Sequence, residues 1–164
     1  MTTSHILSKP LLAMITSVLL LSGCSSSQDP NSLAAKNLAA GTAFLTKNAT
    51  RPEVKTLESG LQYEVLQEGS GKQPKLADWV NVRYRGMHLD GTVFSESDLN
   101  NEPEMVSVKN SLIGWRLALL NMKVGSKWRI YLPPRIAYSN RGVKGMVEPN
   151  ETVIYELELK SIVW

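Results

Sequence analysis

The feature that most constrains this chain is one apolar segment, residues 112–122, in which Arg116 and Asn121 are the main polar exceptions. Its large apolar side chains recur at helical spacing, at Leu112, Trp115, Leu119 and Met122. This spacing predicts one short, deeply buried helix. Much of the chain on both sides alternates with a period of two residues, as β-strands do. We therefore expect an α+β fold in which a curved, mostly antiparallel sheet wraps around this helix.

The alternating segments predict the strands and the side chains that face the core. We expect strands over residues 61–65, 79–89, 92–94, 105–109, 128–132 and 152–163. The inward rows are Val80, Val82 and Tyr84, then Trp128, Ile130 and Leu132, and finally Val153, Tyr155, Leu157 and Leu159. Asp90-Gly91 is a hairpin signal, and Pro133-Pro134 ends a strand because proline has no N–H for the ladder. Residues 95–104 and 138–150 are expected to form loops.

An N-terminal helix is predicted over residues 31–48, with Ser32 as its N-cap. Gly41 lies in its middle, so we expect the helix to be interrupted or frayed there. The apolar run from Leu11 to Leu21 is about half as long as the roughly 20 residues that cross a membrane. That run is therefore predicted to belong to a secretory signal.

The one cysteine, Cys24, ends the sequence Leu-Ser-Gly-Cys directly after that run. The sequence resembles the bacterial lipobox, whose cysteine carries the lipid after cleavage; the alternative is a secretory leader followed by an ordinary thiol. We expect residues 1–23 to be a lipoprotein signal peptide, 24–31 a lipidated tether, 32–58 the N-terminal helix with a linker, and 59–164 the main domain. Ser25 favours sorting to the outer membrane, where several acyl chains would hold the domain facing the periplasm.

The charge balance argues against nucleic acid as a partner. Without Lys9 of the leader, the 18 basic residues of the chain become 17, against 15 acidic residues. The basic residues are also scattered along the sequence. Such a chain has no extended positive surface of the kind that binds phosphate backbones.

Side chains that carry covalent or metal chemistry are nearly absent. His5 lies in the leader, so a serine–histidine arrangement would depend on His88, which we expect at an exposed strand end. No cluster of His, Cys, Asp or Glu has the spacing of a metal site, and no cofactor is expected. The turn at residues 68–72 contains Gly-Ser-Gly-Lys, but Leu66 stands where a phosphate-binding loop needs its first glycine.

Aromatic residues from five different segments are expected to meet near the start of the central helix. They are Tyr84, Phe94, Trp115, Tyr138 and Tyr155. Taken singly, each is most simply an ordinary core residue. Taken together, they are the candidate site of this chain.

Five segments are similar to the FK506-binding-protein (FKBP) class of peptidyl-prolyl isomerases: residues 82–86, 90–94, 112–115, 137–138 and 149–152. They occur in the family's order over residues 59–162, and residues 36–63 resemble the preceding segment of the bacterial macrophage-infectivity-potentiator subgroup. The resemblance implies about five strands half-wrapped around the central helix. Because only residues 31–50 separate the tether from the linker, we also expect a monomer.

The resemblance further implies a shallow apolar pocket for the proline of a client polypeptide. Its residues would be Tyr84, Phe94, Leu112, Trp115, Tyr138, Val147 and Tyr155. Trp115 would lie under the proline ring, and Tyr138 would donate a hydrogen bond to the substrate carbonyl. No nucleophile is needed, because a desolvated pocket favours the twisted amide over the planar, more polar ground state.

The rim of this pocket departs from the family pattern. Ser95 stands at a usual aspartate, Asn100 at a frequent arginine, Glu104 at an apolar wall position and Ser111 at a valine position. We therefore weigh two functions: an isomerase acting on exported proteins, and a binding or chaperone module of the same fold with little turnover. A purely structural envelope lipoprotein is a third alternative.

Overall fold

The computed structural model of the protein describes residue 1 and residues 29–97 and 102–163. The predicted leader, Cys24 and Asn100 lie outside the described residues, so the expectations attached to them stay predictions. Within the described part of the chain, no helix is long and apolar enough to cross a membrane.

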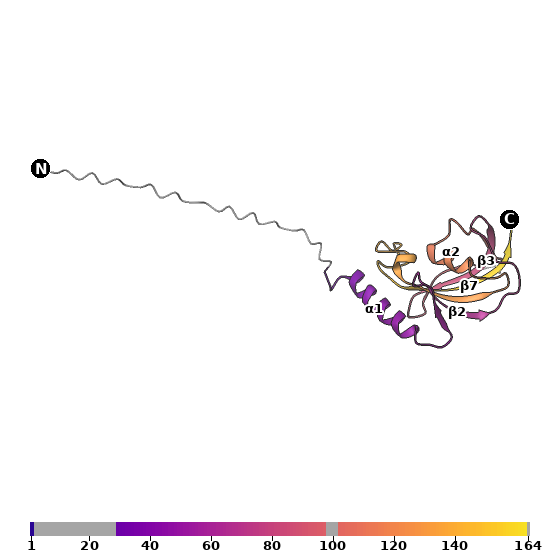
Figure 1. Cartoon of the computed structure of the whole chain (residues 1–164), viewed down its shortest axis with the longest axis horizontal. Coiled ribbons are helices and arrows are strands. Elements are labelled where there is room, and N and C mark those ends of the chain that lie inside the picture. Colours follow the sequence, from indigo (N-terminus) through magenta and orange to yellow (C-terminus); the bar gives the residue numbers. More distant parts are fainter. Residues whose placement is uncertain (2–28, 98–101, 164) are drawn as a thin grey trace.

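The described residues form one curved sheet, two α-helices and one short 3-10 helix (Figure 1). The strands are β1 (Val54–Thr56), β2 (Gln62–Gln67), β3 (Trp79–Met87), β4 (Val93–Glu96), β5 (Glu104–Ser107), β6 (Lys127–Leu132) and β7 (Val153–Ile162). The helices are α1 (Leu33–Asn48), α2 (Ile113–Leu119) and η1 (Pro134–Ile136). The strand order is β1-β2-β6-β7-β3-β4, with β5 also paired to β3. Every pairing between these strands is antiparallel.

The expected fold is confirmed, although the sheet has seven strands rather than about five. One addition is β1, a three-residue strand at the sheet edge that pairs with β2. The other arises because β4 and β5 pair separately with the two halves of β3. The predicted loop over residues 95–104 is wrong at both ends. Ser95 and Glu96 continue β4, and Glu104 begins β5, because pairing with β3 outweighs their polar character.

The core lies between the concave face of the sheet and α2. The predicted inward rows are confirmed, since Val80, Val82, Ile130, Leu157 and Leu159 are fully buried. From α2, Ala118 and Leu119 are also fully buried, and Gly114 lets the helix approach β6 closely, because a Cβ there would meet Leu132. Removing this apolar surface from water is the main force that holds the sheet around the helix.

Helix α1 packs against the opposite, convex face of the sheet (Figure 1). Its predicted cap is confirmed, because the Ser32 hydroxyl accepts a 3.2 Å hydrogen bond from the Ala35 amide. The expected interruption at Gly41 is wrong, since the helix continues through it. Gly41 is buried there, and a Cβ at this position would overlap the hydroxyl of Thr152. The glycine thus permits close approach rather than breaking the helix.

Polar contacts fix the end of α1 and the segment after it. The Asn48 side-chain amide donates to Gln62 Oε1 at 2.9 Å, although both side chains are buried. Arg51 then reaches the hydroxyl of Tyr131 at 3.0 Å and the carboxylate of Glu64 at 3.1 Å. Because these partners lie on β2 and β6, the helix and its linker are held in one orientation on the convex face.

Candidate functional site

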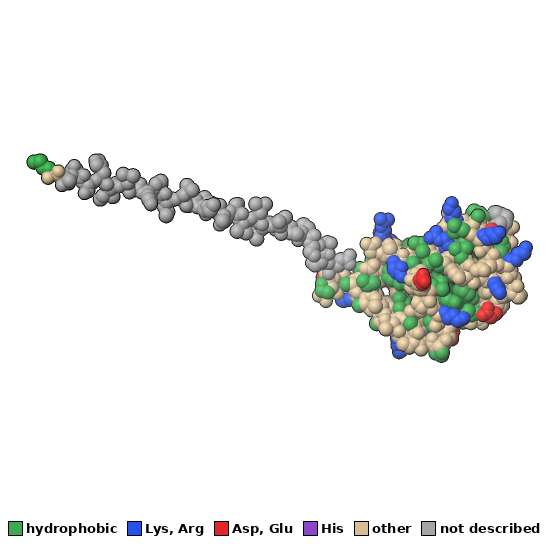
Figure 2. Space-filling model, in the orientation of Figure 1, with side chains coloured by type: hydrophobic (Ala, Val, Ile, Leu, Met, Phe, Trp, Pro, Cys, Tyr) green, Lys and Arg blue, Asp and Glu red, His purple; other side chains and the backbone are tan. Residues whose placement is uncertain are grey.

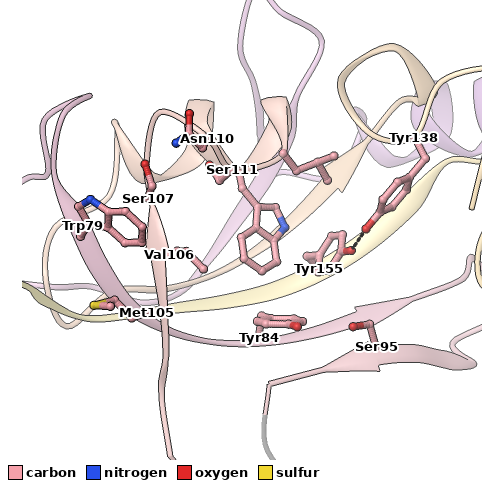
Figure 3. Close-up of a pocket in the computed structure, with 12 residues that line it drawn as sticks. Trp79, Tyr84, Ser95, Met105, Val106, Ser107, Asn110, Ser111, Tyr138 and Tyr155 are labelled. Carbon is pink, nitrogen blue, oxygen red and sulfur yellow. Dashed lines mark hydrogen bonds between the residues drawn. The ribbon is translucent and has the colours of Figure 1, made fainter.

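A cavity of about 360 Å³ opens between the concave face of the sheet and the start of α2 (Figure 3). Its walls come from β3, β4, β5 and β7, from the turn before α2, and from the loop after η1. The lining residues are Trp79, Tyr84, Ser95, Met105, Val106, Ser107, Asn110, Ser111, Leu112, Trp115, Tyr138 and Tyr155. None of them carries a charge, so the cavity is an apolar and weakly polar environment.

Three aromatic rings form the floor of one half of this cavity. The Trp115 ring lies 4.7 Å from that of Tyr84 and 5.1 Å from that of Tyr155, in edge-to-face arrangements. The sequence brings these rings together because Tyr84 and Tyr155 occupy inward positions of neighbouring strands and α2 lies over them. Trp115 is 7% exposed, so its ring is fixed by packing on the core side.

Two hydroxyl groups meet at one end of the cavity. The Tyr138 and Tyr155 hydroxyls are 2.5 Å apart, and either one can be the donor (Figure 3). Burial, followed by the hydrogen bond that the Tyr155 hydroxyl makes with Tyr138, raises the pKa of Tyr155 far above its ordinary value. Burial also raises the pKa of Tyr84. Both phenols are therefore neutral hydrogen-bonding groups at physiological pH.

Five of the seven predicted site residues line the cavity, namely Tyr84, Leu112, Trp115, Tyr138 and Tyr155. The other two lie outside its lining. Phe94 packs its ring 5.6 Å from Tyr155 and 6.4 Å from Tyr138, and so contacts two rings of the wall. Val147 is 3% exposed and pairs with Val143 in the loop that follows Tyr138. What any of the seven does to a ligand stays a prediction.

Glycine at position 86 is a requirement of this aromatic packing. A Cβ there would come within 2.6 Å of the Tyr155 ring and 2.8 Å of the Phe94 ring. Any larger residue would push the two rings apart. The spacing of the cavity wall therefore depends on a residue that has no side chain.

The departures from the family pattern lie at different places around the rim. Ser95 and Ser111 line the cavity, and the Ser111 hydroxyl donates to the Val108 carbonyl at 2.9 Å. Glu104 is exposed, and its register opposite Val82 puts it on the Tyr84 side of the sheet. After burial, the charge of Glu104 further raises the pKa of Tyr84. The carboxylate of Glu104, a residue that the sequence places at an apolar wall position of the family, thus acts on Tyr84 from β5.

Sequence reasoning missed one half of the cavity, which is lined by Trp79, Met105, Val106, Ser107 and Asn110. Trp79 and Met105 fall on the outward phase of the period-two alternation, so the pattern gave no reason to include them. The one signal was their apolar character at positions where an exposed strand face is usually polar.

Two other candidates are ordinary structural elements in the described residues. His88 lies 2.5 Å from the Glu151 carboxylate and does not line the cavity. In the Gly-Ser-Gly-Lys turn, the amides of Gly69 and Gly71 donate to the Ser126 hydroxyl and the Val124 carbonyl, which a phosphate loop would leave free. Residues 29–97 and 102–163 also contain no group of three His, Cys, Asp or Glu side chains able to hold a metal.

The basic side chains do not form a single patch on the face shown in Figure 2. Lys and Arg side chains are spread around the outline of the domain, and apolar side chains occupy much of the middle. On this face, the distribution leaves the basic side chains apart from one another.

Comparisons with known proteins agree with this geometry. Residues 70–160 match the family model described as FKBP-type peptidyl-prolyl cis-trans isomerase. Residues 19–65 match the domain that lies amino-terminal to it in such proteins. The peptidyl-prolyl cis-trans isomerase Mip of Coxiella burnetii is 46% identical over 120 residues, which cover 73% of this chain and 52% of that protein. The outer membrane protein MIP of Legionella longbeachae is 39% identical over 132 residues, covering 80% of this chain and 57% of that protein.

Solved structures show the same fold. A peptidyl-prolyl cis-trans isomerase from Pseudomonas syringae superposes with a TM-score of 0.75 at 30% identity, covering 82% of this chain and 98% of that one. FkpA from Escherichia coli superposes with a TM-score of 0.74 at 36% identity, covering 79% of this chain and 60% of that one. The chain spans a little over half the length of the two MIP-type relatives above. With a family model over more than half of its residues, the chain belongs to the FKBP-type peptidyl-prolyl cis-trans isomerase family.

Proposed function

We propose that this protein catalyses the cis–trans isomerisation of X-Pro peptide bonds in exported polypeptides. The observation that carries this proposal is the uncharged cavity floored by Trp115, Tyr84 and Tyr155. A proline ring is apolar and flat enough to lie on an indole face. The family relationship supplies the reaction type, and the cavity supplies a place for it.

The chemistry needs a surrounding that stabilises a twisted amide more than a planar one. The planar amide is resonance-stabilised and polar, and the barrier to rotation is about 20 kcal/mol. A cavity without charges solvates the polar planar form poorly, while the twisted form has lost part of that charge separation. Transfer from water to the cavity therefore raises the free energy of the planar form more than that of the twisted form. The rotation barrier falls without any covalent step.

The tyrosine pair adds one directed hydrogen bond. If Tyr155, the more buried of the two, donates to the Tyr138 oxygen, the Tyr138 hydrogen is free to reach a carbonyl in the cavity. That carbonyl would be the one preceding the proline, whose oxygen swings during rotation. A fixed donor placed for the twisted geometry stabilises the transition state more than the ground state.

The N-terminal sequence supports a proposed location for this activity. The lipobox-like Cys24 supports a lipid-anchored protein at the outer membrane, facing the periplasm. One relative carries the name outer membrane protein MIP, in keeping with this location. We expect the anchored protein to be a monomer, with proline-containing polypeptides as clients. Replacing Cys24 by serine should abolish incorporation of labelled fatty acid and release the domain from membranes.

A protease-coupled assay on a proline-containing tetrapeptide tests the isomerase proposal. Uncatalysed isomerisation takes tens to hundreds of seconds, so catalysis appears as a faster approach to complete cleavage. We expect micromolar protein to raise this rate well above background. No increase at that concentration would contradict the enzyme function.

The same fold without turnover is the second candidate. Ser95 and Ser111 favour it, because both line the cavity at positions where the family pattern has a charged or a larger apolar residue. For a binding module, adding a proline peptide should shift the amide NMR signals of the cavity residues. The isomerisation rate should nevertheless stay at background. The two measurements together separate the candidates.

A further inference from the structure

The cavity extends beyond the aromatic floor into a second half. In Figure 3, Tyr138 and Ser95 lie on one side, and Trp79, Met105 and Val106 lie on the other. One proline ring is much smaller than 360 Å³, so it leaves the second half unfilled. The wall of that half, which we call the β5 wall, is made by Trp79, Met105 and Val106.

Strand β5 borders this half, and β3 is the one strand within residues 29–97 and 102–163 that pairs with it. Along an antiparallel strand, successive residues direct their N–H and C=O groups to opposite sides. The Val108 amide donates to the Asp78 carbonyl at 3.0 Å, which fixes the phase of the pairing between β5 and β3. By this phase, Val106 and Glu104 bond to β3, and Met105 points its N–H and C=O away from it.

Met105 therefore presents an unused donor and acceptor beside the cavity. No residue within 29–97 or 102–163 pairs with its backbone on that side. The neighbouring Ser107 carbonyl is already taken by the amides of Asn110 and Ser111. An unpaired strand edge is a template for another extended chain.

The side chain of Met105 adds an apolar contact at the same place. It is 46% exposed, although methionine is favoured in the interior. Its flexible thioether adapts to differently shaped partners. An exposed methionine that lines a cavity beside a free strand edge is a feature that a ligand would cover.

We propose that the client chain, on one side of its proline, pairs in extended form with the backbone of Met105 and inserts an apolar side chain against the β5 wall. This inference rests on the proposed function, which brings the X-Pro bond into the first half of the same cavity. An extended chain advances about 3.3 Å per residue, and we assign the inserted side chain to a position about two to four residues from the proline. The backbone pairing gives affinity, and the wall gives the preference for an apolar residue.

Peptides of different length test the inference. A proline tetrapeptide is compared with four eight-residue peptides. Two are extended before the proline and two after it. In each direction, one peptide has leucine and the other has serine at the third position from the proline. We expect kcat/KM to rise about tenfold for the leucine peptide on one side only, and little for the serine peptide. Equal rates for the tetrapeptide and all the longer peptides would overturn the inference.

A matched pair of variants places the effect at β5. Met105→Ala removes the exposed side chain at the wall, and Leu76→Ala removes an equally exposed one, 47% against 46%, outside the cavity lining. The quantity compared is the ratio of kcat/KM for the long peptide to that for the tetrapeptide. We expect Met105→Ala to lower this ratio about threefold to fivefold and Leu76→Ala to leave it unchanged. Equal effects of the two variants would contradict the assigned position.

Amide hydrogen exchange separates this inference from the proposed function. Pairing with a client strand should slow exchange of the Met105 amide, and N-methylation of the client amide that pairs with it should reverse the slowing. This readout needs binding but no turnover. Slowed exchange with no catalysis would refute only the proposed function, whereas catalysis with unchanged exchange at Met105 would refute only the inference.

Discussion

Two cavities lie on opposite faces of the same sheet, and the smaller one suits the chemistry. The concave cavity has a volume of about 360 Å³ and an uncharged lining. The convex cavity, beside α1, is larger at about 540 Å³, but Lys47, Arg51, Arg129 and Glu156 line it. Charged walls keep water ordered in a cavity and stabilise polar ground states. For amide rotation, the character of the lining therefore matters more than the volume.

Tyrosine side chains show the same contrast between the two faces. Tyr131, under α1, has its hydroxyl bonded to Arg51 at 3.0 Å and to Glu64 at 3.1 Å. Among the described residues, the hydroxyl of Tyr155 on the concave face has the neutral hydroxyl of Tyr138 as its one hydrogen-bond partner. The convex tyrosine is committed to a charged structural network. The concave pair keeps one hydrogen that it can direct to a ligand.

The largest expected effect tests whether catalysis belongs to the concave face alone. Trp115→Leu removes the proposed floor, and we expect kcat/KM to fall about a hundredfold, equivalent to about 2.7 kcal/mol of transition-state stabilisation. Trp128→Leu is the matched control. It removes a tryptophan of the same burial, 6% exposed against 7%, from the same face but outside the cavity lining.

We expect Trp128→Leu to lower the free energy of unfolding and leave kcat/KM nearly unchanged. The Trp128 ring stacks on Tyr63 at 4.3 Å, so its contribution is to packing. Circular dichroism and urea titration of both variants establish that each is folded under assay conditions. Equal losses of kcat/KM in the two variants would show that the site has no special dependence on Trp115.

The next effect concerns stability on the convex face. Gly41→Ala places a methyl group against the Thr152 hydroxyl, and we expect the free energy of unfolding to fall by about 2 kcal/mol. Urea unfolding measures the change, and kcat/KM should stay within about twofold of the parent value. In a Thr152→Ala background the same glycine substitution should be less harmful. A stabilising effect, as expected for alanine in an isolated helix, would contradict the close packing.

Sequence periodicity predicted the parts of this molecule in which burial alone decides position. The inward rows of β3, β6 and β7 followed from alternation, because each strand has one face on a single core. The aromatic floor followed for the same reason. Gly41 was misread because its effect depends on Thr152, more than a hundred residues away, and no local propensity contains that contact.

The missed features share a different physical cause. Strand β1 is three residues long and mostly exposed, so its sequence has too little alternation to detect. Trp79 and Met105 reach the cavity where β5 borders the sheet, although both alternate with positions paired to the inward row of β3. Which side chains reach the cavity at a sheet edge depends on how the strands pair. The alternation of residues along the sequence does not contain that pairing.

A third prediction concerns how stability depends on pH through Glu156, which lines the convex cavity. Burial disfavours the charge of Glu156, but hydrogen bonds from Arg129 and Lys127 outweigh it and lower the pKa of this carboxyl. A lowered folded-state pKa contributes stability that is present above the ordinary value of 4.5 and is lost as the pH falls through the folded-state value. We expect Glu156→Gln to lose less stability than the parent below about pH 4.5, by under about 1 kcal/mol because the group is partly solvated. Urea midpoints at several pH values measure this, and identical acid profiles would contradict it.

The smallest expected effect lies at the rim of the concave cavity. Ser95→Asp places a carboxylate beside Tyr84, where it can accept a hydrogen bond from the phenol and fix the ring edge, so we expect kcat/KM to rise about twofold to threefold. The gain is small because the charge of Glu104 already acts on Tyr84. Ser95→Asn, of the same shape without the charge, should give no gain. An unchanged or lower rate for the aspartate variant would contradict this prediction. It would mean that repulsion from Glu104, and the water that a second carboxylate brings to the cavity, cost more than the hydrogen bond to Tyr84 contributes. The cavity would then function best with no further charge at its rim.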